Sequence, residues 1–482
     1  MQNRTTNTNN SLSIKSPLGD LGVDIITAIS TPPGMGAIAV IRLSGEGCIA
    51  VVDRLFVSPS GKKLVKAKAN TALFGQVVFN NEVVDEVLVT VFRAPHSFTG
   101  EESVEISCHG SVYIQQKIVE ALIVQGIRLA KAGEFTRRAF KNGKFDLSQA
   151  EAVADLIASS SQASHRVAMN QMRGGFADKL TDLRDKLLQF VSLIELELDF
   201  SEEDVEFANR QKLYELTEEI EREIDKLANS FQLGNAIKNG IPVAIIGETN
   251  AGKSTLLNLL LNEEKAIVSD IHGTTRDVIE DIVNIGGVTF RFIDTAGIRS
   301  TTDTIESLGI ERTFQKIEQA SIVLWMIDLT TPAEKIESLA QSIVPKLNEK
   351  QVVLLFNKSD LISNAELTEK QNILPNLEAE RLFISAKKQQ NTDVLVQLLL
   401  KAAHIPQIGE NDVIVTNLRH YEALTKALAA IRRVKEGLEI GITSDFISQD
   451  IRECMFYLGE ITGQISTDEV LGNIFSRFCI GK

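Results

Sequence analysis

Residues 241–261 read IPVAIIGETNAGKSTLLNLLL, and this stretch predicts the fold of the middle of the chain. The run VAIIG predicts a buried strand, residues 247–254 (GETNAGKS) match G-x-x-x-x-G-K-[ST], and STLLNLLL predicts a helix. Such a loop surrounds the β-phosphate of a nucleotide with backbone N–H groups, at a helix N-terminus whose dipole favours anions. Lys253 then faces the β- and γ-phosphates, and the Ser254 hydroxyl completes a Mg²⁺ shell. A chance glycine turn is the alternative, and the flanking strand and helix argue against it.

The strand pattern continues on the C-terminal side of this loop. The apolar runs TFRFID, IVLWMID, VVLLFN and RLFIS alternate with segments of helix length up to about His404. Apolar strands that alternate with helices are typical of a parallel α/β sheet covered on both faces. We therefore predict a nucleotide-binding domain over residues 239–404.

Two further motifs predict which base is bound. Residues 357–360 (NKSD) follow the strand VVLLF, and the Asp360 carboxylate can accept hydrogen bonds from N1–H and the 2-amino group of guanine. Adenine lacks the 2-amino donor, so this carboxylate would stay unpaired against ATP. Residues 385–387 (SAK) follow another strand, where their backbone would close over O6 of the base; alone, they could be an ordinary turn. In this order the motifs predict a Ras-like P-loop GTPase domain.

The residues around the γ-phosphate include one departure from the Ras-like pattern. Thr275 is the candidate switch hydroxyl that reaches Mg²⁺, and residues 294–297 (DTAG) place a carboxylate near the metal. In Ras-like GTPases a Gln after this segment orients the attacking water, but here the residue is the apolar Ile298. We expect the acidic loop that follows to supply the missing group, with Glu306 as the candidate; a solvated loop charge is the alternative. The amide oxygen of Asn250 could hold a monovalent cation against the phosphates.

The flanking sequence predicts two further domains. Residues 21–143 are rich in short alternating strands, such as AVIRL and VEISC, which indicates an α+β domain after a disordered polar tail at 1–20. Residues 144–238 and 405–482 carry apolar residues at 3- and 4-residue steps, as expected of long antiparallel helices in a bundle. Since helical segments lie on both sides of the GTPase domain, we predict that it is inserted into the helical domain.

Composition narrows the class of protein. The 482 residues carry a formal charge of −14, and we expect no cluster of lysines and arginines, which argues against a stand-alone nucleic-acid binder. The four cysteines have no C-x-x-C spacing, so we expect no disulfide framework or zinc site, and a reducing compartment. No apolar run approaches the roughly 18 residues of a membrane span, and the first residues lack a secretory signal, so we expect a cytoplasmic protein.

Four segments, GETNAGKST, DIHGTTRD, DTAGIR…ESLGIER and FCIGK, together resemble the MnmE (TrmE) family of tRNA modification GTPases. The likeness runs from about Asp24 to Lys482, and FCIGK joined to an inserted GTPase domain is its most specific part. The resemblance implies a homodimer that works in a heterotetramer with the flavoprotein MnmG (GidA), which holds FAD. It also implies addition of an aminomethyl or carboxymethylaminomethyl group to C5 of the wobble uridine of certain tRNAs. The one-carbon source would be 5-formyl- or 5,10-methylene-tetrahydrofolate.

The resemblance further implies roles for particular residues. Tetrahydrofolate would contact Arg42, Glu105, Lys144 and Lys482 in an N-terminal folate-binding and dimerisation domain. Mg²⁺ would bind Ser254 and Thr275, and K⁺ would bind Asn250, the carbonyls of Ser269 and Ile271, and Thr274. Catalysis would depend on Glu306 and Lys253, with two GTPase domains meeting across the dimer. The GTP-binding set comprises Asn250, Ala251, Gly252, Lys253, Ser254, Thr255, Ser269, Asp270, Ile271, His272, Gly273, Thr274, Thr275, Asp294, Thr295, Ala296, Gly297, Asn357, Lys358, Asp360, Ser385, Ala386 and Lys387.

Some residues depart from the family pattern, and two other functions remain open. Ser111 and Ala132 stand where a Gly and a Pro are usual, and His272 lies in the loop expected to bind K⁺. Cys479 could have a chemical role beside the folate, but we expect a buried packing residue. A GTP-dependent switch in ribosome or RNA assembly is the alternative function, although such proteins usually carry a basic module. An inactive scaffold is a third possibility, which the intact GTPase motifs disfavour.

Overall fold

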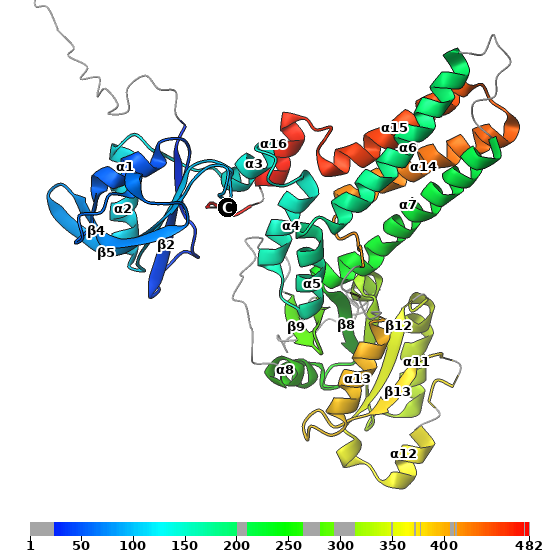
Figure 1. Cartoon of the computed structure of the whole chain (residues 1–482). Coiled ribbons are helices and arrows are strands. Elements are labelled where there is room, and N and C mark those ends of the chain that lie inside the picture. The colour runs from blue at the N-terminus through cyan, green and yellow to red at the C-terminus, as the bar shows by residue number, and fades with distance from the viewer. Residues whose placement is uncertain are drawn as a thin grey trace, which may run out of the picture. The chain divides into compact units, whose positions relative to one another are not determined.

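The computed structural model describes residues 24–199, 210–263, 280–293, 314–348, 350–370, 373–375, 377–404, 409, 412–476 and 478–481. Its contacts divide the chain into two compact units, one of Met1–Glu151 with Thr462–Lys482 and the other of Ala152–Ile461. The tail predicted at 1–20 lies outside the described residues, and the predicted limits of three domains stay predictions. The mixed α/β architecture with a helical part is as expected (Figure 1).

The first unit contains a seven-stranded sheet in the order β3-β4-β5-β6-β2-β1-β7. Neighbouring strands are antiparallel, except for the parallel pair β1 and β7. The strands are β1 Ile26–Ile29, β2 Ile38–Ser44, β3 Phe56–Val57, β4 Thr71–Phe79, β5 Glu82–Phe92, β6 Ser103–His109 and β7 Arg128–Leu129. The helices are α1 Cys48–Leu55, α2 Val112–Val124, α3 Glu134–Lys141 and α16 Asp468–Ser476, with a 3₁₀ turn at Leu64–Lys66.

Alternation along these strands places successive residues on opposite faces of the sheet. Ile41 and Leu43 on β2 and Ile106 on β6 point into a core that α1 and α2 complete on one face of the sheet (Figure 1). Arg42 and Glu105 lie between these positions and therefore on the opposite face. The strands predicted around AVIRL and VEISC are confirmed, whereas β4 was not predicted.

Long helices form a bundle in the second unit (Figure 1). The predicted apolar stripes are buried: Leu180, Leu187 and Ile194 lie on α6, and Ile220 and Ile224 lie on α7. These residues pack with α14 and α15 in one core, which satisfies the 3.6-residue periodicity of the sequence. The bounds are α4 Leu147–Ala158, α5 Gln162–Met172, α6 Gly175–Asp199, α7 Arg210–Asn239, α14 Leu418–Ile440 and α15 Ser444–Thr462.

A six-stranded sheet in the order β13-β12-β11-β8-β10-β9 forms the rest of this unit. Its strands are β8 Ile241–Gly247, β9 Asp281–Ile285, β10 Val288–Phe292, β11 Ile322–Asp328, β12 Gln351–Asn357 and β13 Glu380–Phe383. Its helices are α8 Lys253–Glu263, α11 Ala333–Ile343, α12 Asn364–Lys370 and α13 Thr392–Ala402, with 3₁₀ turns at Val344–Lys346 and Ser359–Leu361. Separate apolar cores cover its two faces. The predicted parallel pairing is found between β8, β10, β11, β12 and β13, whereas the edge strand β9, which was not predicted, pairs with β10 in antiparallel orientation.

On the N-terminal side of this sheet, a single residue separates the bundle from the first strand. Helix α7 ends at Asn239 and strand β8 begins at Ile241, so only Gly240 separates them. The same strand ends at Gly247, where the glycine-rich loop begins. One continuous segment therefore runs from the helical bundle to the predicted phosphate-binding loop.

We expect Gly234→Ala to destabilise the bundle. A Cβ at this position on α7 would lie 2.0 Å from the carbonyl oxygen of Val415, which backbone movement must relieve. The cost should be about 1–3 kcal/mol of unfolding free energy, seen as a lower midpoint of urea denaturation. Gly472→Ala is the control, because a Cβ on this helical glycine meets nothing within 4 Å and should raise stability by up to about 1 kcal/mol. Equal midpoints for both variants would contradict this packing.

Candidate functional site

The glycine-rich loop between β8 and α8 has space only for glycine at Gly252. This residue has φ 105°, and a Cβ would lie 2.2 Å from Nδ2 of Asn357. Asn250 also adopts a left-handed conformation, with φ 66°. These conformations turn the chain so that Lys253 begins α8 directly after the loop. The strand, loop and helix predicted from residues 241–261 are confirmed, and the helix N-terminus points its N–H groups toward the loop.

The Lys253 ammonium lies over this loop. Its Nζ donates hydrogen bonds to the carbonyl oxygens of Gly247 at 2.8 Å and Glu248 at 2.7 Å. Burial lowers the pKa of Lys253, because a desolvated ammonium is less stable than a hydrated one, and the nearby Lys316 lowers it further. A partly desolvated cation held at a loop of this kind interacts strongly with an anion, as phosphate chemistry requires.

The Asn357 side chain connects two loops at the end of the sheet. It is 4% exposed, and its Nδ2 donates to the carbonyl oxygen of Ala251 at 2.7 Å. Its Oδ1 accepts from the backbone N–H of Ala386 at 3.0 Å. The nitrogen and the oxygen of this buried amide therefore fix the position of the glycine-rich loop relative to residues 385–387. The sequence predicted that these motifs meet, but not that this side chain joins them.

Asp360 and its neighbours complete the same edge. The Ser385 hydroxyl donates to Oδ1 of Asp360 at 2.7 Å, which orients the carboxylate predicted to read guanine. Lys358 Nζ pairs with Oδ2 of Asp328 at 2.5 Å. Burial favours the neutral form of Asp328, but hydrogen bonds from Lys358 and Thr330 outweigh it and lower the pKa of Asp328. Asp328 was missed at first, although a carboxylate that ends the apolar strand IVLWMI is a recognisable signal.

These loops follow β8, β12 and β13, at the carboxyl ends of parallel strands where α/β sheets bind ligands. The structure gathers Asn357, Asp360, Ser385 and Ala386 there, and Lys387 lies exposed beside them. Ser254 and Thr255 lie in the first turn of α8. The remaining candidates lie outside the described residues: Ser269, Asp270, Ile271, His272, Gly273, Thr274, Thr275, Asp294, Thr295, Ala296, Gly297, Ile298, Glu306 and Lys482.

A second group of candidate residues lies on the sheet of the first unit. Arg42 and Glu105 are directly opposite each other on β2 and β6. Arg42 donates to Oε1 of Glu105 from Nε at 3.0 Å and from Nη2 at 2.8 Å. Both bonds end on Oε1, and no described residue donates to Oε2. One oxygen of the carboxylate is therefore available to accept a further hydrogen bond.

Aromatic rings surround this ion pair. The Arg42 guanidinium lies 5.3 Å from the ring centre of Phe98 and 5.9 Å from that of Phe135. Phe98 in turn lies 5.7 Å from Phe145, and Lys144 Nζ donates to the carbonyl oxygen of Pro95 at 3.2 Å in the same loop. A carboxylate, a guanidinium and apolar rings are the groups that a flat heterocycle with polar edges needs. No sequence pattern pointed to these phenylalanines.

The C-terminal segment reaches the same unit but corrects one expectation. The carbonyl oxygen of Gly481 accepts a hydrogen bond from the Ser30 hydroxyl at 3.2 Å, just after β1. The prediction that Cys479 is a buried packing residue is wrong, because its side chain is exposed; Phe478 is the apolar residue that is buried there. All four cysteines are free thiols.

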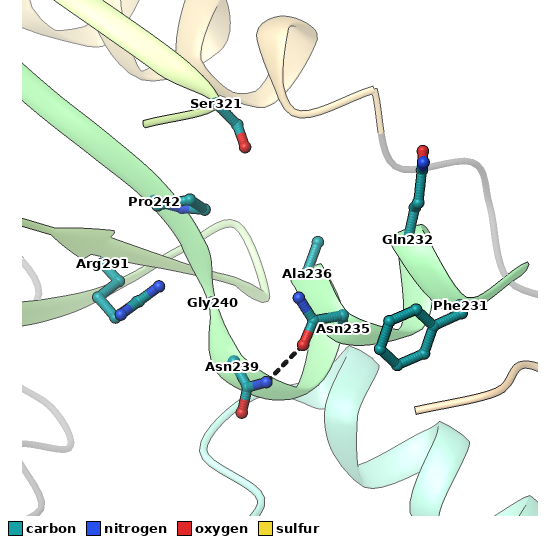
Figure 2. Close-up of a pocket in the computed structure, with 9 residues that line it drawn as sticks. All are labelled: Phe231, Gln232, Asn235, Ala236, Asn239, Gly240, Pro242, Arg291 and Ser321. Carbon is teal, nitrogen blue, oxygen red and sulfur yellow. Dashed lines mark hydrogen bonds between the residues drawn. The ribbon is translucent and has the colours of Figure 1, made fainter. Parts of the chain in front are cut away.

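One pocket of the second unit lies away from the glycine-rich loop. A pocket of about 620 Å³ lies where α7 meets the amino ends of β8 and β11, lined by Asn239, Pro242 and Ser321 among others (Figure 2). It is at the opposite end of the sheet from the glycine-rich loop, so we do not assign it to the nucleotide.

In the described ranges, no group of three or more His, Cys, Asp or Glu side chains lies close enough together to hold a metal ion. Within the same ranges every helix is too short or too polar to cross a membrane.

Comparison with known proteins gives two family matches. The model described as "GTP-binding protein TrmE N-terminus" matches residues 25–144, and the one described as "MnmE helical domain" matches residues 147–479. The protein called tRNA modification GTPase MnmE in Bacteroides thetaiotaomicron is 61% identical over 463 residues, which is 95% of this chain and 99% of that protein. That of Flavobacterium johnsoniae is 54% identical over 462 residues, again 95% and 99% of the two chains.

Among solved structures, Era in complex with MgGDPNP and a segment of 16S ribosomal RNA is 33% identical. The match covers 39% of this chain and 66% of that chain, with a TM-score of 0.27. A TM-score this low supports no conclusion.

Asn357→Ala should weaken guanine nucleotide binding by about tenfold or more. The substitution leaves the Ala251 carbonyl and the Ala386 N–H without their buried partner, at a cost of about 1–3 kcal/mol. Titration with a fluorescent GDP analogue measures the loss. Asn348→Ala, which removes an exposed amide of the same unit, should leave the affinity unchanged. If Asn357→Ala bound GDP as tightly as the unchanged protein, the amide would not hold the site together.

Proposed function

Because the chain belongs to the MnmE family of tRNA modification GTPases, we propose that its GTP hydrolysis drives modification of the wobble uridine of certain tRNAs. The product would carry an aminomethyl or carboxymethylaminomethyl group on C5, and the FAD-containing flavoprotein MnmG (GidA) would be the partner. That the chain is a GTP hydrolase follows from the family. The observation that carries the proposal is the buried Asn357 amide, which joins a phosphate-binding loop to a guanine-reading edge.

Recognition of the base would rest on Asp360. Its carboxylate would accept hydrogen bonds from N1–H and the 2-amino group of guanine, while the Ser385 hydroxyl holds it in place. Adenine has no 2-amino group, so an adenine that covers this carboxylate would leave it unpaired. This cost disfavours ATP. Asn357 would act indirectly, because its amide positions the two loops rather than the base.

For the phosphates, Lys253 and the N–H groups of the loop would balance the charge that develops as the γ-phosphate leaves. Mg²⁺ at Ser254 and Thr275, and K⁺ at Asn250, Ser269, Ile271 and Thr274, would supply further positive charge. Asn250 suits this role, because its left-handed backbone brings an exposed amide to the edge of the loop. Glu306 would orient the attacking water, since Ile298 has no polar atom to do so. Equal hydrolysis rates in KCl and NaCl would rule out the K⁺ site.

The one-carbon unit would be bound on the sheet of the first unit. Oε2 of Glu105 would accept an N–H of the pterin of 5-formyl- or 5,10-methylene-tetrahydrofolate, with Phe98 beside the ring, while the buried Phe135 supports Arg42 from the core. Lys144 and Lys482 would offer cations to the glutamyl tail. The residues fit the cofactor, because they pair a hydrogen-bond acceptor with apolar surfaces and positive charge.

A second copy of the chain would cover part of the same sheet. Phe74 on β4 and Leu88 on β5 lie directly opposite each other and are 54% and 44% exposed. They lie on the face away from α1 and α2, two residues along the strands from the row that holds Glu105. Apolar side chains that adjoin a binding site in this way favour a homodimer.

The function is tested in cells that lack this protein. The full chain should restore the modified wobble uridine, measured by mass spectrometry of digested tRNA. Glu306→Ala should bind GTP normally, lose GTP turnover by about a hundredfold or more, and fail to restore the modification. Glu311→Ala, which changes an acid five residues further along the sequence, serves as the control. Normal modification in cells without the protein would overturn the proposal.

Arg42→Ala should weaken binding of 5-formyl-tetrahydrofolate by about tenfold to a hundredfold, because Glu105 loses the partner that orients it. Isothermal titration calorimetry measures this, with GTP hydrolysis as a check that the rest of the protein is intact. Arg54→Ala, which removes an exposed arginine of α1, should bind the folate normally. Unchanged affinity in Arg42→Ala would place the folate elsewhere.

A further inference from the structure

The first unit contains a groove that none of the predicted functions uses. It encloses about 880 Å³ and lies between α16 and the segment that runs from β7 through α3. Lys131, Arg137 and Lys141 line it on one side, and Gly472 and Ser476 line it on the other. The Arg42–Glu105 pair and the glycine-rich loop do not line it, so it is distinct from both candidate sites.

The segment that forms this groove is strongly basic. Residues 128–144 (RLAKAGEFTRRAFKNGK) contain six lysines and arginines and a single acid, Glu134, in a chain whose net charge is −14. The expectation that the chain has no basic cluster is therefore wrong. Apolar and small residues separate the charges along the sequence, and α3 places Arg137 and Lys141 on one face of a helix.

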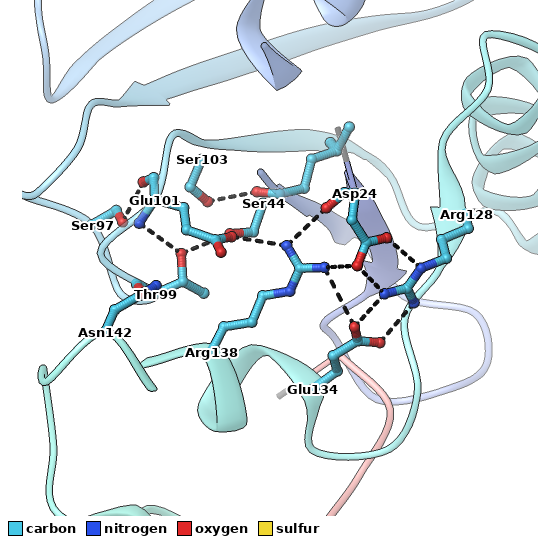
Figure 3. Close-up of polar contacts among 11 residues, drawn as sticks. Asp24, Ser44, Ser97, Thr99, Glu101, Ser103, Arg128, Glu134, Arg138 and Asn142 are labelled. Carbon is cyan, nitrogen blue, oxygen red and sulfur yellow. Dashed lines mark hydrogen bonds and ion pairs between the residues drawn. The ribbon is translucent and has the colours of Figure 1, made fainter. Parts of the chain in front are cut away.

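Two of these arginines are already neutralised. Arg128 donates to both oxygens of Asp24, at 2.6 and 2.7 Å, and to both oxygens of Glu134, at 2.8 and 2.5 Å (Figure 3). Arg138 donates to Asp24 at 2.8 Å and to Glu101 at 3.0 Å. Burial alone would favour the neutral form of Glu134, but hydrogen bonds from Arg128 and the Lys131 backbone lower the pKa of Glu134 to about 2. This network of ion pairs supports α3.

Three of the other four cations, Lys131, Arg137 and Lys141, line the groove. Lys131 and Lys141 are exposed, and within the described ranges no acidic side chain pairs with either of them. Arg137 and Lys141 are four residues apart on α3 and so share a face of the helix, while the adjacent Arg138 turns to the network. Asp24, Glu101 and Glu134 each pair with Arg128 or Arg138. Glu46 is the other acidic residue that lines the groove.

We propose that this groove binds phosphate groups of the tRNA backbone through Lys131 and Lys141, with Arg137 beside them. The proposal rests on the proposed role in tRNA modification. A chain of charge −14 repels RNA at long range, so a local surplus of cations is needed wherever the RNA approaches. Exposed lysines on a rigid support suit phosphate contacts, which position a nucleic acid without reading its sequence.

The test is filter binding of unmodified tRNA to the full-length protein over a series of salt concentrations. Lys131→Ala with Lys141→Ala should weaken binding by about tenfold at physiological salt and lower the slope of log K against log salt by about one to two. Lys131→Arg with Lys141→Arg should restore both values. GTP hydrolysis and thermal unfolding should not change, since neither lysine belongs to the nucleotide site or to the ion-pair network.

A matched control removes Lys62 and Lys68, two exposed lysines of the same unit that do not line the groove. An equal loss in this control, or unchanged affinity and slope in the Ala pair, would overturn the proposal. Loss of flavoprotein binding with normal tRNA binding would make the groove a protein-docking surface and also overturn it. Suppose that the unchanged protein restores the modified uridine in cells but the variant with both Lys131→Ala and Lys141→Ala binds tRNA normally. The groove proposal then fails, whereas the proposed function stands.

Discussion

The side-chain amide of Asn357 is the constraint on which the nucleotide end of the molecule depends. It is buried, and each of its polar atoms has one partner, in loops that follow different strands of the sheet. A buried amide that loses either partner keeps the full cost of desolvation, so the two loops are stable only together. Gly252 is part of the same constraint, because any side chain there would occupy the position of Nδ2.

Much of this fold follows from the sequence, because burial on both faces leaves a continuous apolar pattern. Strands β8, β11 and β12 are central in their sheet and were predicted from such runs. Strand β9 was missed since it is a short edge strand, and its residue Ile282 is 59% exposed. The pattern of β9 (DIVNI) is too weakly apolar to distinguish it from a loop, unlike that of the other edge strand, β13, which was predicted from RLFIS.

The candidate sites were predictable only where chemistry fixes local spacing. The glycine-rich loop and residues 357–360 are short contiguous segments, so their motifs can be recognised in the sequence without knowledge of the fold. By contrast, Arg42 and Glu105 are 63 residues apart and meet through the register of β2 and β6, which a single sequence does not specify. Only the resemblance to a family pointed to them. The rings of Phe98 and Phe135 beside Arg42 had no signal at all.

The junction at Gly240 gives the second unit a mechanical property. Helix α7 has 30 residues and is therefore about 45 Å long, and it continues into the strand that ends at the glycine-rich loop. A tilt of about 5° at this junction displaces the far end of a rod of that length by about 4 Å. Strand β8 has 7 residues and is therefore about 23 Å long, so the same tilt moves the glycine-rich loop by only about 2 Å, half the displacement at the other end of α7.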